Sequence, residues 1–174
     1  MSGIGEKFKT FWHHVAPLLL ILFFMILEVI PYNIAGYTGI KPELILIAIF
    51  YWSVHKPSLM SPLLSFLLGL TLDMISALPL GVNALTFVLI NKLATDQRRV
   101  FLGQPYWVSW AGFSIVALLA ICVQTALVYL ITGALAEYSN LLMIFILTVA
   151  LFPLISFLLI ASHKIMLRSK QGNI

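Results

Sequence analysis

Long apolar runs dominate this sequence, and they limit what the chain can fold into more than any other feature. Cut at prolines, glycines and charged clusters, the chain divides into six apolar segments. These segments are residues 14–31, 43–54, 59–76, 80–95, 106–131 and 140–163. A helix needs roughly 20 residues to cross about 30 Å of hydrocarbon, so six or seven crossings are the most that this length allows. We therefore predict one all-α, polytopic membrane domain over residues 1–174, with six transmembrane helices.

The composition excludes several other classes of protein. Hydrophobic residues make up 61% of the chain and charged residues 9%, whereas roughly a quarter of positions are charged in a soluble domain. The single cysteine, Cys122, excludes an internal disulfide, and the four histidines have no chelating spacing. The formal charge of +4 is scattered rather than gathered into a basic stripe. We expect no metal, no cofactor, no nucleic-acid partner and no soluble catalytic domain.

Three segments carry features beyond plain apolar length. The first has the charge layout of a signal peptide, but its apolar run ends in Glu28 to Pro31 without a small-residue cleavage site, which predicts a retained helix. The second, 43–54, is short for a full span and favours membrane thinning, tilt or partial insertion. Pro153 lies deep in the last segment and predicts a kink, whose freed carbonyl a neighbouring helix or the Ser156 hydroxyl accommodates.

The distribution of lysine and arginine predicts the orientation. With six crossings, nine of these residues fall on one side of the membrane and only Lys41 falls on the other. The nine are Lys7, Lys9, Lys56, Lys92, Arg98, Arg99, Lys164, Arg168 and Lys170. The positive-inside bias therefore places both termini in the cytoplasm. The basic loop at residues 96–99 fits anionic lipid headgroups better than catalysis.

Ionisable residues at membrane depth are candidate functional residues because they are costly there. Asp73 shares a helical stripe with Ser65, Gly69 and Ser76. This stripe fits two alternatives, a polar pocket or a helix-packing seam in which the carboxylate has partners.

Other polar residues fall in the outer halves of their segments, as Asp73 does: Glu28, Glu43, Asn83 and Gln124. We therefore expect an outward-facing cavity or groove beneath the outer surface. For Glu43 a first-turn carboxylate that complements the helix dipole is the plainer alternative. For Asn83 and Gln124 it is hydrogen bonding between helices. No nucleophile accompanies the carboxylates, which argues against an enzyme, including an intramembrane lipid-modifying one.

Three short motifs occur together in this chain. Residues 41–44 read Lys-Pro-Glu-Leu, residues 69–73 read Gly-Leu-Thr-Leu-Asp, and residues 79–84 read Pro-Leu-Gly-Val-Asn-Ala. This combination resembles the rod shape-determining protein MreD family. The run 97–105 looks like versions of this family from alphaproteobacteria. In physical terms, Pro79 stops one helix, Gly81 permits a sharp reversal, and Asn83 is placed to cap the next helix.

The resemblance implies a non-enzymatic inner-membrane scaffold of the elongation machinery, or elongasome, that builds lateral peptidoglycan and maintains rod shape. It implies binding to MreC, and links to RodA and a penicillin-binding transpeptidase, directly or through MreC, and to MreB filaments indirectly. The implied fold is similar to the substrate-binding component of energy-coupling-factor transporters. A vitamin-like small-molecule carrier is therefore the alternative function. The candidate pocket or partner-binding residues are Glu28, Glu43, Gly69, Asp73, Pro79, Gly81, Asn83 and Gln124.

Overall fold

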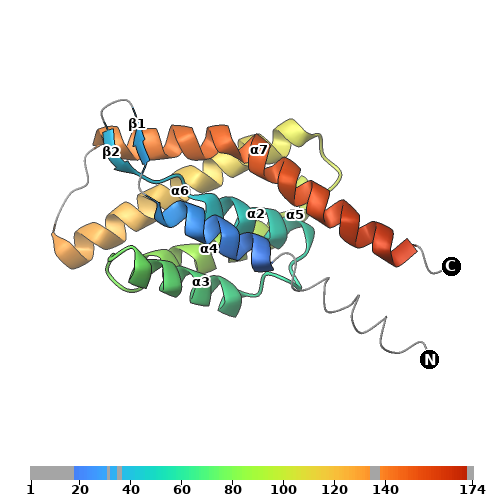
Figure 1. The fold of residues 1–174 in the computed structure, drawn as a ribbon, viewed down its shortest axis with the longest axis horizontal. Helices are drawn as coiled ribbons and strands as arrows, with labels where there is room; N and C mark the ends of the chain where they lie inside the picture. Colours follow the sequence, from blue (N-terminus) through green and yellow to red (C-terminus); the bar gives the residue numbers. More distant parts are fainter. Residues whose placement is uncertain (1–17, 31, 35–36, 134–137, 172–174) are drawn as a thin grey trace.

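The computed structural model describes residues 18–30, 32–34, 37–133 and 138–171, and it is a bundle of helices with one small hairpin (Figure 1). The elements in chain order are a first helix Leu18–Val29, β1 Tyr32–Ile34, β2 Tyr37–Ile40, α2 Leu44–His55, α3 Pro62–Ile75, α4 Val82–Asp96, α5 Arg98–Phe101, α6 Tyr106–Thr132 and α7 Tyr138–Gln171. The expected helical residues 14–17 and the expected cytoplasmic residues Lys7 and Lys9 lie outside the described residues.

Local sequence signals set several of these boundaries. The Ser61 hydroxyl caps α3 by accepting the backbone N–H of Leu64 at 3.1 Å, and Pro62 follows it, where a missing N–H costs little. Gly133 ends α6 with a φ of 69°, and Gly81 precedes α4 with a φ of 104°. Both angles fall in the left-handed region that glycine occupies without steric cost.

The short helix α2 is the centre of the bundle. Every residue from Leu44 to Val54 is buried, and α2 packs against α4, α6 and α7. Ile21, Phe24 and Met25 of the first helix join the same core. A helix that is apolar on all sides is one that protein surrounds on all sides. This burial accounts for the uniform hydrophobicity of the segment. The short length of the segment, from which we expected thinning, tilt or partial insertion, is that of a helix at the centre of the bundle.

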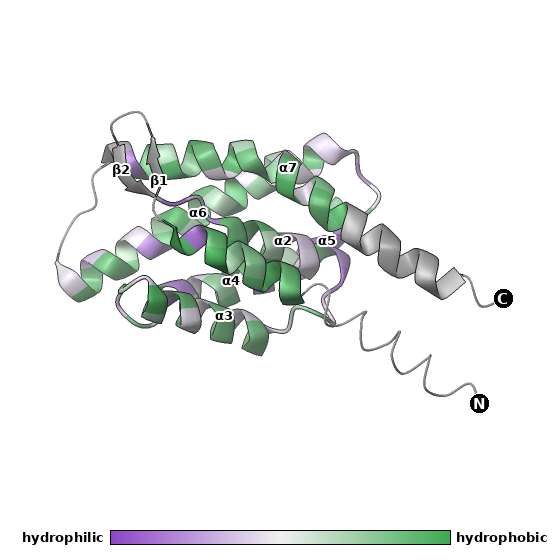
Figure 2. Ribbon diagram, in the orientation of Figure 1, coloured by the Kyte–Doolittle hydropathy of each residue, from purple (hydrophilic) through white to green (hydrophobic). Residues whose placement is uncertain are grey.

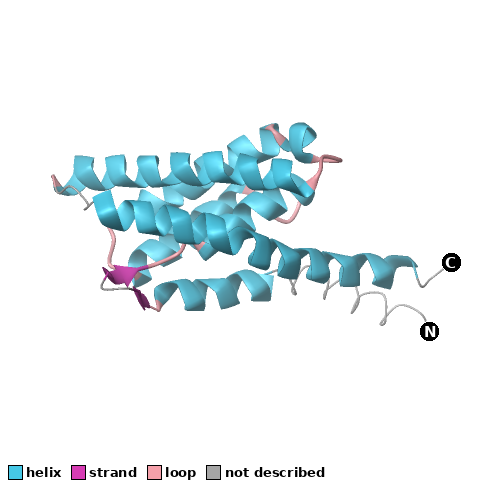
Figure 3. Ribbon diagram, turned by 90° about the horizontal axis from the view of Figure 1, so that it is seen from above, coloured by secondary structure: helices cyan, strands magenta, loops and turns pink. Residues whose placement is uncertain are grey.

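Two elements lie where the sequence predicted only connections. β1 and β2 form an antiparallel hairpin between the first helix and α2, with Tyr32 paired to Ile40. The one-turn helix α5 lies between α4 and α6 at the other end of the bundle from the hairpin (Figure 1). Figure 3 shows the two strands of the hairpin at one end of the bundle. The last helix is also longer than expected, since α7 continues to Gln171 rather than ending at residue 163.

Apolar residues occupy most of the length of the helices in the bundle (Figure 2). Ile115 and Leu130 of α6 and Phe157 of α7 are 71%, 78% and 69% exposed. Among the described residues, two stretches are long and apolar enough to cross a bilayer, Tyr106–Thr132 and Asn140–Ile160. The helices Leu18–Val29, α2 and α3 are apolar but shorter. Apart from the hairpin, the regular structure of the described residues is helical, and its two long apolar helices are consistent with a membrane protein.

Pro153 lies inside α7, as predicted. It leaves one carbonyl of α7 without its usual donor within the helix, and the neighbouring helix supplies a donor instead. A proline has no N–H, so the carbonyl of Val149 lacks its usual donor four residues later. The indole N–H of Trp110 on α6 donates to this carbonyl at 3.1 Å. The Ser156 hydroxyl donates to the carbonyl of Pro153 itself at 3.1 Å. The predicted accommodation by a neighbouring helix is confirmed.

Candidate functional site

Asp73 holds together the turn between α3 and α4. Its side chain is fully buried, and its two carboxylate oxygens accept the backbone N–H groups of Gly81 at 2.8 Å and Asn83 at 2.9 Å, with Ala84 at 3.4 Å. The first N–H groups of a helix have no partner within the helix, and the helix dipole favours a negative charge there. Asp73 therefore acts as the capping group of α4, supplied from the preceding helix.

The expected capping role of Asn83 is wrong. The N-cap position is Gly81, one residue before Val82 begins α4, so Asn83 is already inside the first turn. Its Oδ1 instead accepts a hydrogen bond of 2.9 Å from Nε2 of the Gln124 side-chain amide on α6. This bond matches the interhelical alternative for both side chains. Pro79 lies in the connection after α3, before the left-handed Gly81.

The stripe predicted on α3 forms a close helix contact. A Cβ on Gly69 would lie 2.5 Å from the Cα and N atoms of Ala84, so only a hydrogen fits there. Ser65, one turn earlier, is also fully buried. α3 and α4 accordingly pack along their lengths (Figure 1). Of the two alternatives for this stripe, the packing seam describes these contacts.

Glu28 caps the start of α2 from another helix, as Asp73 caps the start of α4. It lies near the end of the first helix, is 5% exposed, and its Oε2 accepts the backbone N–H of Ile45 at 2.8 Å. The residue at the N-cap of α2 itself, Glu43, makes no side-chain capping bond among the described residues. Its own backbone N–H donates to the Thr148 hydroxyl of α7 at 3.1 Å. The dipole of α2 thus meets a carboxyl group from another helix as well as that of its own N-cap residue.

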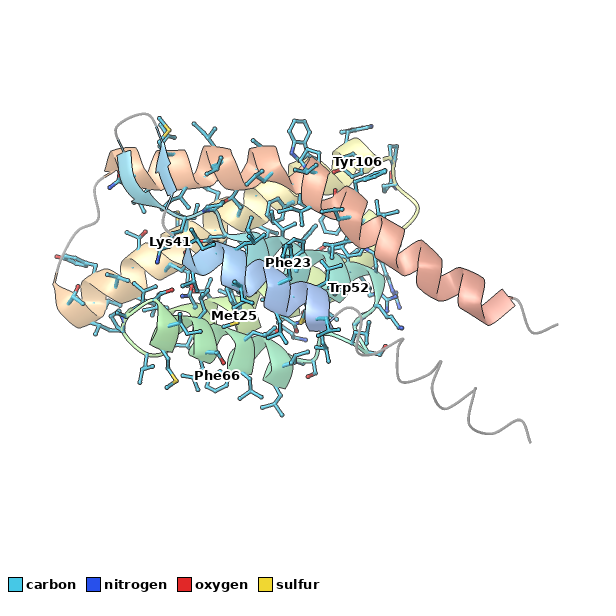
Figure 4. All side chains as sticks on the ribbon, in the orientation of Figure 1. Phe23, Met25, Lys41, Trp52, Phe66 and Tyr106 are labelled. Atoms are coloured by element: carbon cyan, nitrogen blue, oxygen red, sulfur yellow. The ribbon has the colours of Figure 1, made fainter. Side chains whose placement is uncertain are left out.

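A cavity of about 370 Å³ opens where α2 and α4 begin. We call it the acidic cavity. Its lining comprises Glu28, Lys41, Glu43, Leu72, Ser76, Leu78, Val82, Asn83, Gln124, Thr125, Val128, Leu141 and Ile144. Lys41 lies toward the end of the bundle opposite Tyr106 and Trp52 (Figure 4). The two carboxyl groups in the lining interact electrostatically with each other, and Lys41 supplies a positive charge near them.

One oxygen in the acidic cavity lacks a partner. Oε2 of Glu43 is buried and has no hydrogen-bond partner among the described residues. The Gln124 amide interacts with the same carboxyl group while it also donates to Asn83. An unpaired buried carboxylate oxygen costs free energy unless a donor reaches it. The cavity therefore has a vacant acceptor of hydrogen bonds or positive charge.

The eight candidate residues separate into two groups. Glu28, Glu43, Asn83 and Gln124 line the acidic cavity together. Gly69, Asp73, Pro79 and Gly81 do not line it, but Asp73 holds the backbone of Asn83 in place. Sequence reasoning missed Thr148, whose hydroxyl fixes the backbone of Glu43. A lone threonine within the apolar run 141–160 was the signal that could have identified it.

No cluster of three or more histidine, cysteine, aspartate or glutamate side chains that could hold a metal occurs among the described residues. The polar residues in the lining of the acidic cavity carry two carboxyl groups, two side-chain amides, two hydroxyl groups and one lysine.

Comparison with known proteins identifies the family. The family model described as rod shape-determining protein MreD matches residues 8–161, which is most of the chain. The chain belongs to the MreD family. The rod shape-determining protein MreD of Haemophilus influenzae is 35% identical over 79 residues, which cover 45% of this chain and 47% of that relative. The match thus spans about half the length of the curated relative. No solved structure matches the chain at a significant level.

Family membership gives the motifs a context. The family is named for the determination of rod shape, and membership supports such a role for this chain. The Gly69 to Asp73 helix and the Pro79 to Ala84 turn, on which the resemblance was based, are the segments that Asp73 ties together. In this chain the motif therefore fixes the geometry of two packed helices beside the acidic cavity.

Proposed function

We propose that this chain is a non-enzymatic inner-membrane scaffold of the machinery that elongates the peptidoglycan wall, and that it binds MreC. RodA and a penicillin-binding transpeptidase join the assembly directly or through MreC, and MreB filaments join it indirectly. The observation that carries this proposal is the family match over residues 8–161. Both termini lie in the cytoplasm in this proposal, as the positive-inside bias predicts.

The use of the buried polar groups supports a structural role. Asp73 and Glu28 each hold the start of another helix. Asn91 on α4 donates to the Ser53 hydroxyl and to the Met60 carbonyl, both at 2.8 Å. Such bonds between elements stabilise the packing of the helices. The outward apolar faces of α6 and α7 offer surface for lipid or for the transmembrane helix of a partner.

The acidic cavity is the proposed partner or ligand site on the outer side of the membrane. Its residues Glu28, Glu43, Asn83 and Gln124 converge from four different elements. The vacant Oε2 of Glu43 suits a donor or a cation that enters from outside. Gly69, Asp73, Pro79 and Gly81 contribute by holding the α3–α4 turn at the wall of this cavity.

A second candidate function is a small-molecule binding component of a transporter, similar in fold to the vitamin binders of energy-coupling-factor systems. The observation that favours it is the same cavity, whose volume of about 370 Å³ lies within the usual range for small-molecule sites. This alternative predicts a ligand retained during purification and a transporter module that contacts the cytoplasmic face. The scaffold predicts neither.

Purification in a mild detergent, followed by mass spectrometry of everything that stays bound, separates the two functions. The scaffold predicts co-purification of MreC and elongation synthases, and the carrier predicts a stoichiometric small molecule with an ATPase module. Glu43→Gln should keep the fold, because its Oε2 makes no hydrogen bond among the described residues. Asp96→Asn, on the exposed end of α4, is the matched control.

The two candidate functions predict different results for the Glu43→Gln protein. Loss of MreC from the Glu43→Gln protein, with normal retention by Asp96→Asn, supports a partner site in the acidic cavity. Loss of a bound small molecule with intact assembly supports the carrier. A Glu43→Gln protein that retains MreC and supports wall elongation as the unaltered protein does would contradict the proposed role of the cavity.

A further inference from the structure

A second cavity lies at the opposite end of the central helix. Its volume is about 320 Å³, and it opens between the C-terminal end of α2, the one-turn helix α5 with the connection after it, and the helices α6 and α7. We call it the aromatic cavity, because Phe50, Phe101 and Phe152 form its inner wall. Tyr106, in its lining, lies at the end of the bundle away from Lys41 and the acidic cavity (Figure 4).

The inner wall of the aromatic cavity is apolar and consists of packed rings. The Phe50 ring lies 5.4 Å from the Phe101 ring and 6.1 Å from the Phe152 ring, measured between centroids. Phe113 stacks on Phe152 from behind at 4.4 Å. A Cβ on Gly112 would overlap the Phe101 ring. Because glycine has no Cβ, the Phe101 ring of α5 can pack directly against α6. A hydrocarbon chain is a suitable occupant for such a wall.

The outer part of the same cavity is polar. His55, which stacks on Tyr51 at 4.2 Å, lines it together with Gln104 and Ser109. No acidic residue is present in the lining among the described residues. The cavity thus presents hydrogen-bonding groups at its outer part and aromatic rings at its inner wall.

Three cations neighbour the lining of this cavity along the chain, although their own side chains are not part of that lining. Arg98 and Arg99 occupy the helical turn that ends at Phe101, and Lys56 follows His55. The one ion pair among the described residues, Lys92 with Asp96 at 3.0 Å, involves none of these three cations and occupies a nearby carboxylate. The Nε atom of Arg98 is also buried without a hydrogen-bond partner among the described residues. An anion, and above all a phosphate, satisfies this arrangement.

We propose that the aromatic cavity binds an anionic phospholipid, with its apolar tail against Phe50, Phe101 and Phe152 and its phosphate at Arg98 and Arg99. The ligand is amphiphilic because aromatic rings line the cavity and two arginines lie on α5, the helical turn that carries one of these rings. The positive-inside bias places this end at the cytoplasmic leaflet, where anionic headgroups attract basic residues. This site is separate from the acidic cavity and does not depend on MreC binding.

The test uses the purified full chain, delipidated in detergent and examined by native mass spectrometry. The probes are phosphatidylglycerol, phosphatidylcholine with the same acyl chains, and glycerol 3-phosphate. We expect one phosphatidylglycerol to bind with an apparent affinity about 10-fold or more above that of phosphatidylcholine. Glycerol 3-phosphate should not displace it, because the headgroup alone gains nothing from the aromatic wall.

Two independent variants examine the two ends of the site. Arg98→Gln combined with Arg99→Gln should lower the apparent affinity for phosphatidylglycerol about 10-fold and reduce the preference over phosphatidylcholine. Ser109→Leu should fill the cavity and remove the bound lipid. The matched controls are Lys92→Gln, a cation outside the cavity, and Ser114→Leu, a serine of the same helix whose hydroxyl bonds to the Trp110 carbonyl. Both controls should bind as the unaltered chain does.

Three results would overturn the proposal. Equal binding of the two phospholipids would mean that the basic turn does not select a charge. Displacement by glycerol 3-phosphate would indicate a site for a soluble phosphate ester. An effect of Lys92→Gln as large as that of the double arginine variant would indicate attraction by general surface charge. Elution as a single monodisperse species confirms that each variant is folded before binding is measured.

Discussion

The Oδ1 atom of Asp73 on α3 accepts the backbone N–H of Asn83 on α4 at 2.9 Å. Oδ2 of the same carboxylate accepts the N–H groups of Gly81 and Ala84. Because Asp73 is fully buried, no water replaces these bonds when the side chain is changed. The Asp73 carboxylate, which lies within an apolar segment of the sequence, therefore has the structural role of joining α3 to α4.

Asp73→Leu should prevent stable folding. It leaves N–H groups at the start of α4 buried without an acceptor, at a cost of about 1–3 kcal/mol for each unpaired group. Asp73→Asn retains one acceptor oxygen and should be less damaging. The measurement is thermal unfolding in detergent, with Asp96→Asn as the control for a carboxylate on an exposed surface. An Asp73→Leu protein that unfolds at the temperature of the unaltered chain would disprove the capping role.

Gly69→Ala should destabilise the α3–α4 pair. The added methyl group would lie 2.5 Å from backbone atoms of Ala84, which cannot rotate away as a side chain would. Overpacking of this kind typically costs about 1–3 kcal/mol. The comparison is with Ala126→Val, which adds more volume at an exposed position of α6. Similar unfolding temperatures for the two variants would mean that the helices separate easily and that Gly69 is not needed for their contact.

The sequence predicted the helical segments and the residues that meet at the acidic cavity better than it predicted individual bonds. Proline, glycine and charge positions mark helix ends locally, so the segments 59–76 and 80–95 correspond closely to α3 and α4. The convergence of Glu28, Glu43, Asn83 and Gln124 could be predicted from two things alone, the alternating direction of the helices and the depth of each residue. Which side chain caps α4, Asp73 or Asn83, could not be predicted in this way. That depends on how α3 is rotated against α4 after the two helices have packed.

Other features depend on tertiary structure that no local pattern encodes. In the sequence, the only sign that α2 lies at the centre of the bundle is its uniform hydrophobicity. A short segment inserted in the membrane has the same pattern, so the pattern does not distinguish the two. Thr148 acquires its role from the approach of α7 to the N-cap residue of α2, 105 positions away. The hairpin between residues 32 and 40 closes a connection that carries no strong turn signal of its own.

Trp110 and Pro153 should be energetically coupled. Trp110→Phe removes the donor that satisfies the Val149 carbonyl and should cost about 0.5–1.5 kcal/mol of unfolding free energy. In a Pro153→Ala background the helix regains its own N–H at position 153, so the same substitution should cost less. A double-mutant cycle on unfolding free energies measures this difference. Trp107→Phe, on the exposed side of the same helix, is the control. Additive effects of Trp110→Phe and Pro153→Ala would contradict the coupling.

The orientation predicted by charge has a direct test in cysteine accessibility. In a Cys122→Ser background, Ser58→Cys reports on the connection after α2 and Leu80→Cys reports on the turn before α4. Both positions are exposed, so a reagent that reaches their side of the membrane can react. A membrane-impermeant maleimide should label Leu80→Cys in intact spheroplasts, and Ser58→Cys only after permeabilisation, because the basic connections stay in the cytoplasm.

The opposite labelling pattern would move the acidic cavity to the cytoplasmic side and the aromatic cavity to the outer side. That result would contradict the proposed entry of a partner or ligand from outside and the proposed source of the phospholipid. Labelling of both cysteines in intact spheroplasts would instead contradict the separation of charge, since α3 would then not pass from one surface to the other. The two positions lie beyond the two ends of α3, so this single helix decides between the outcomes.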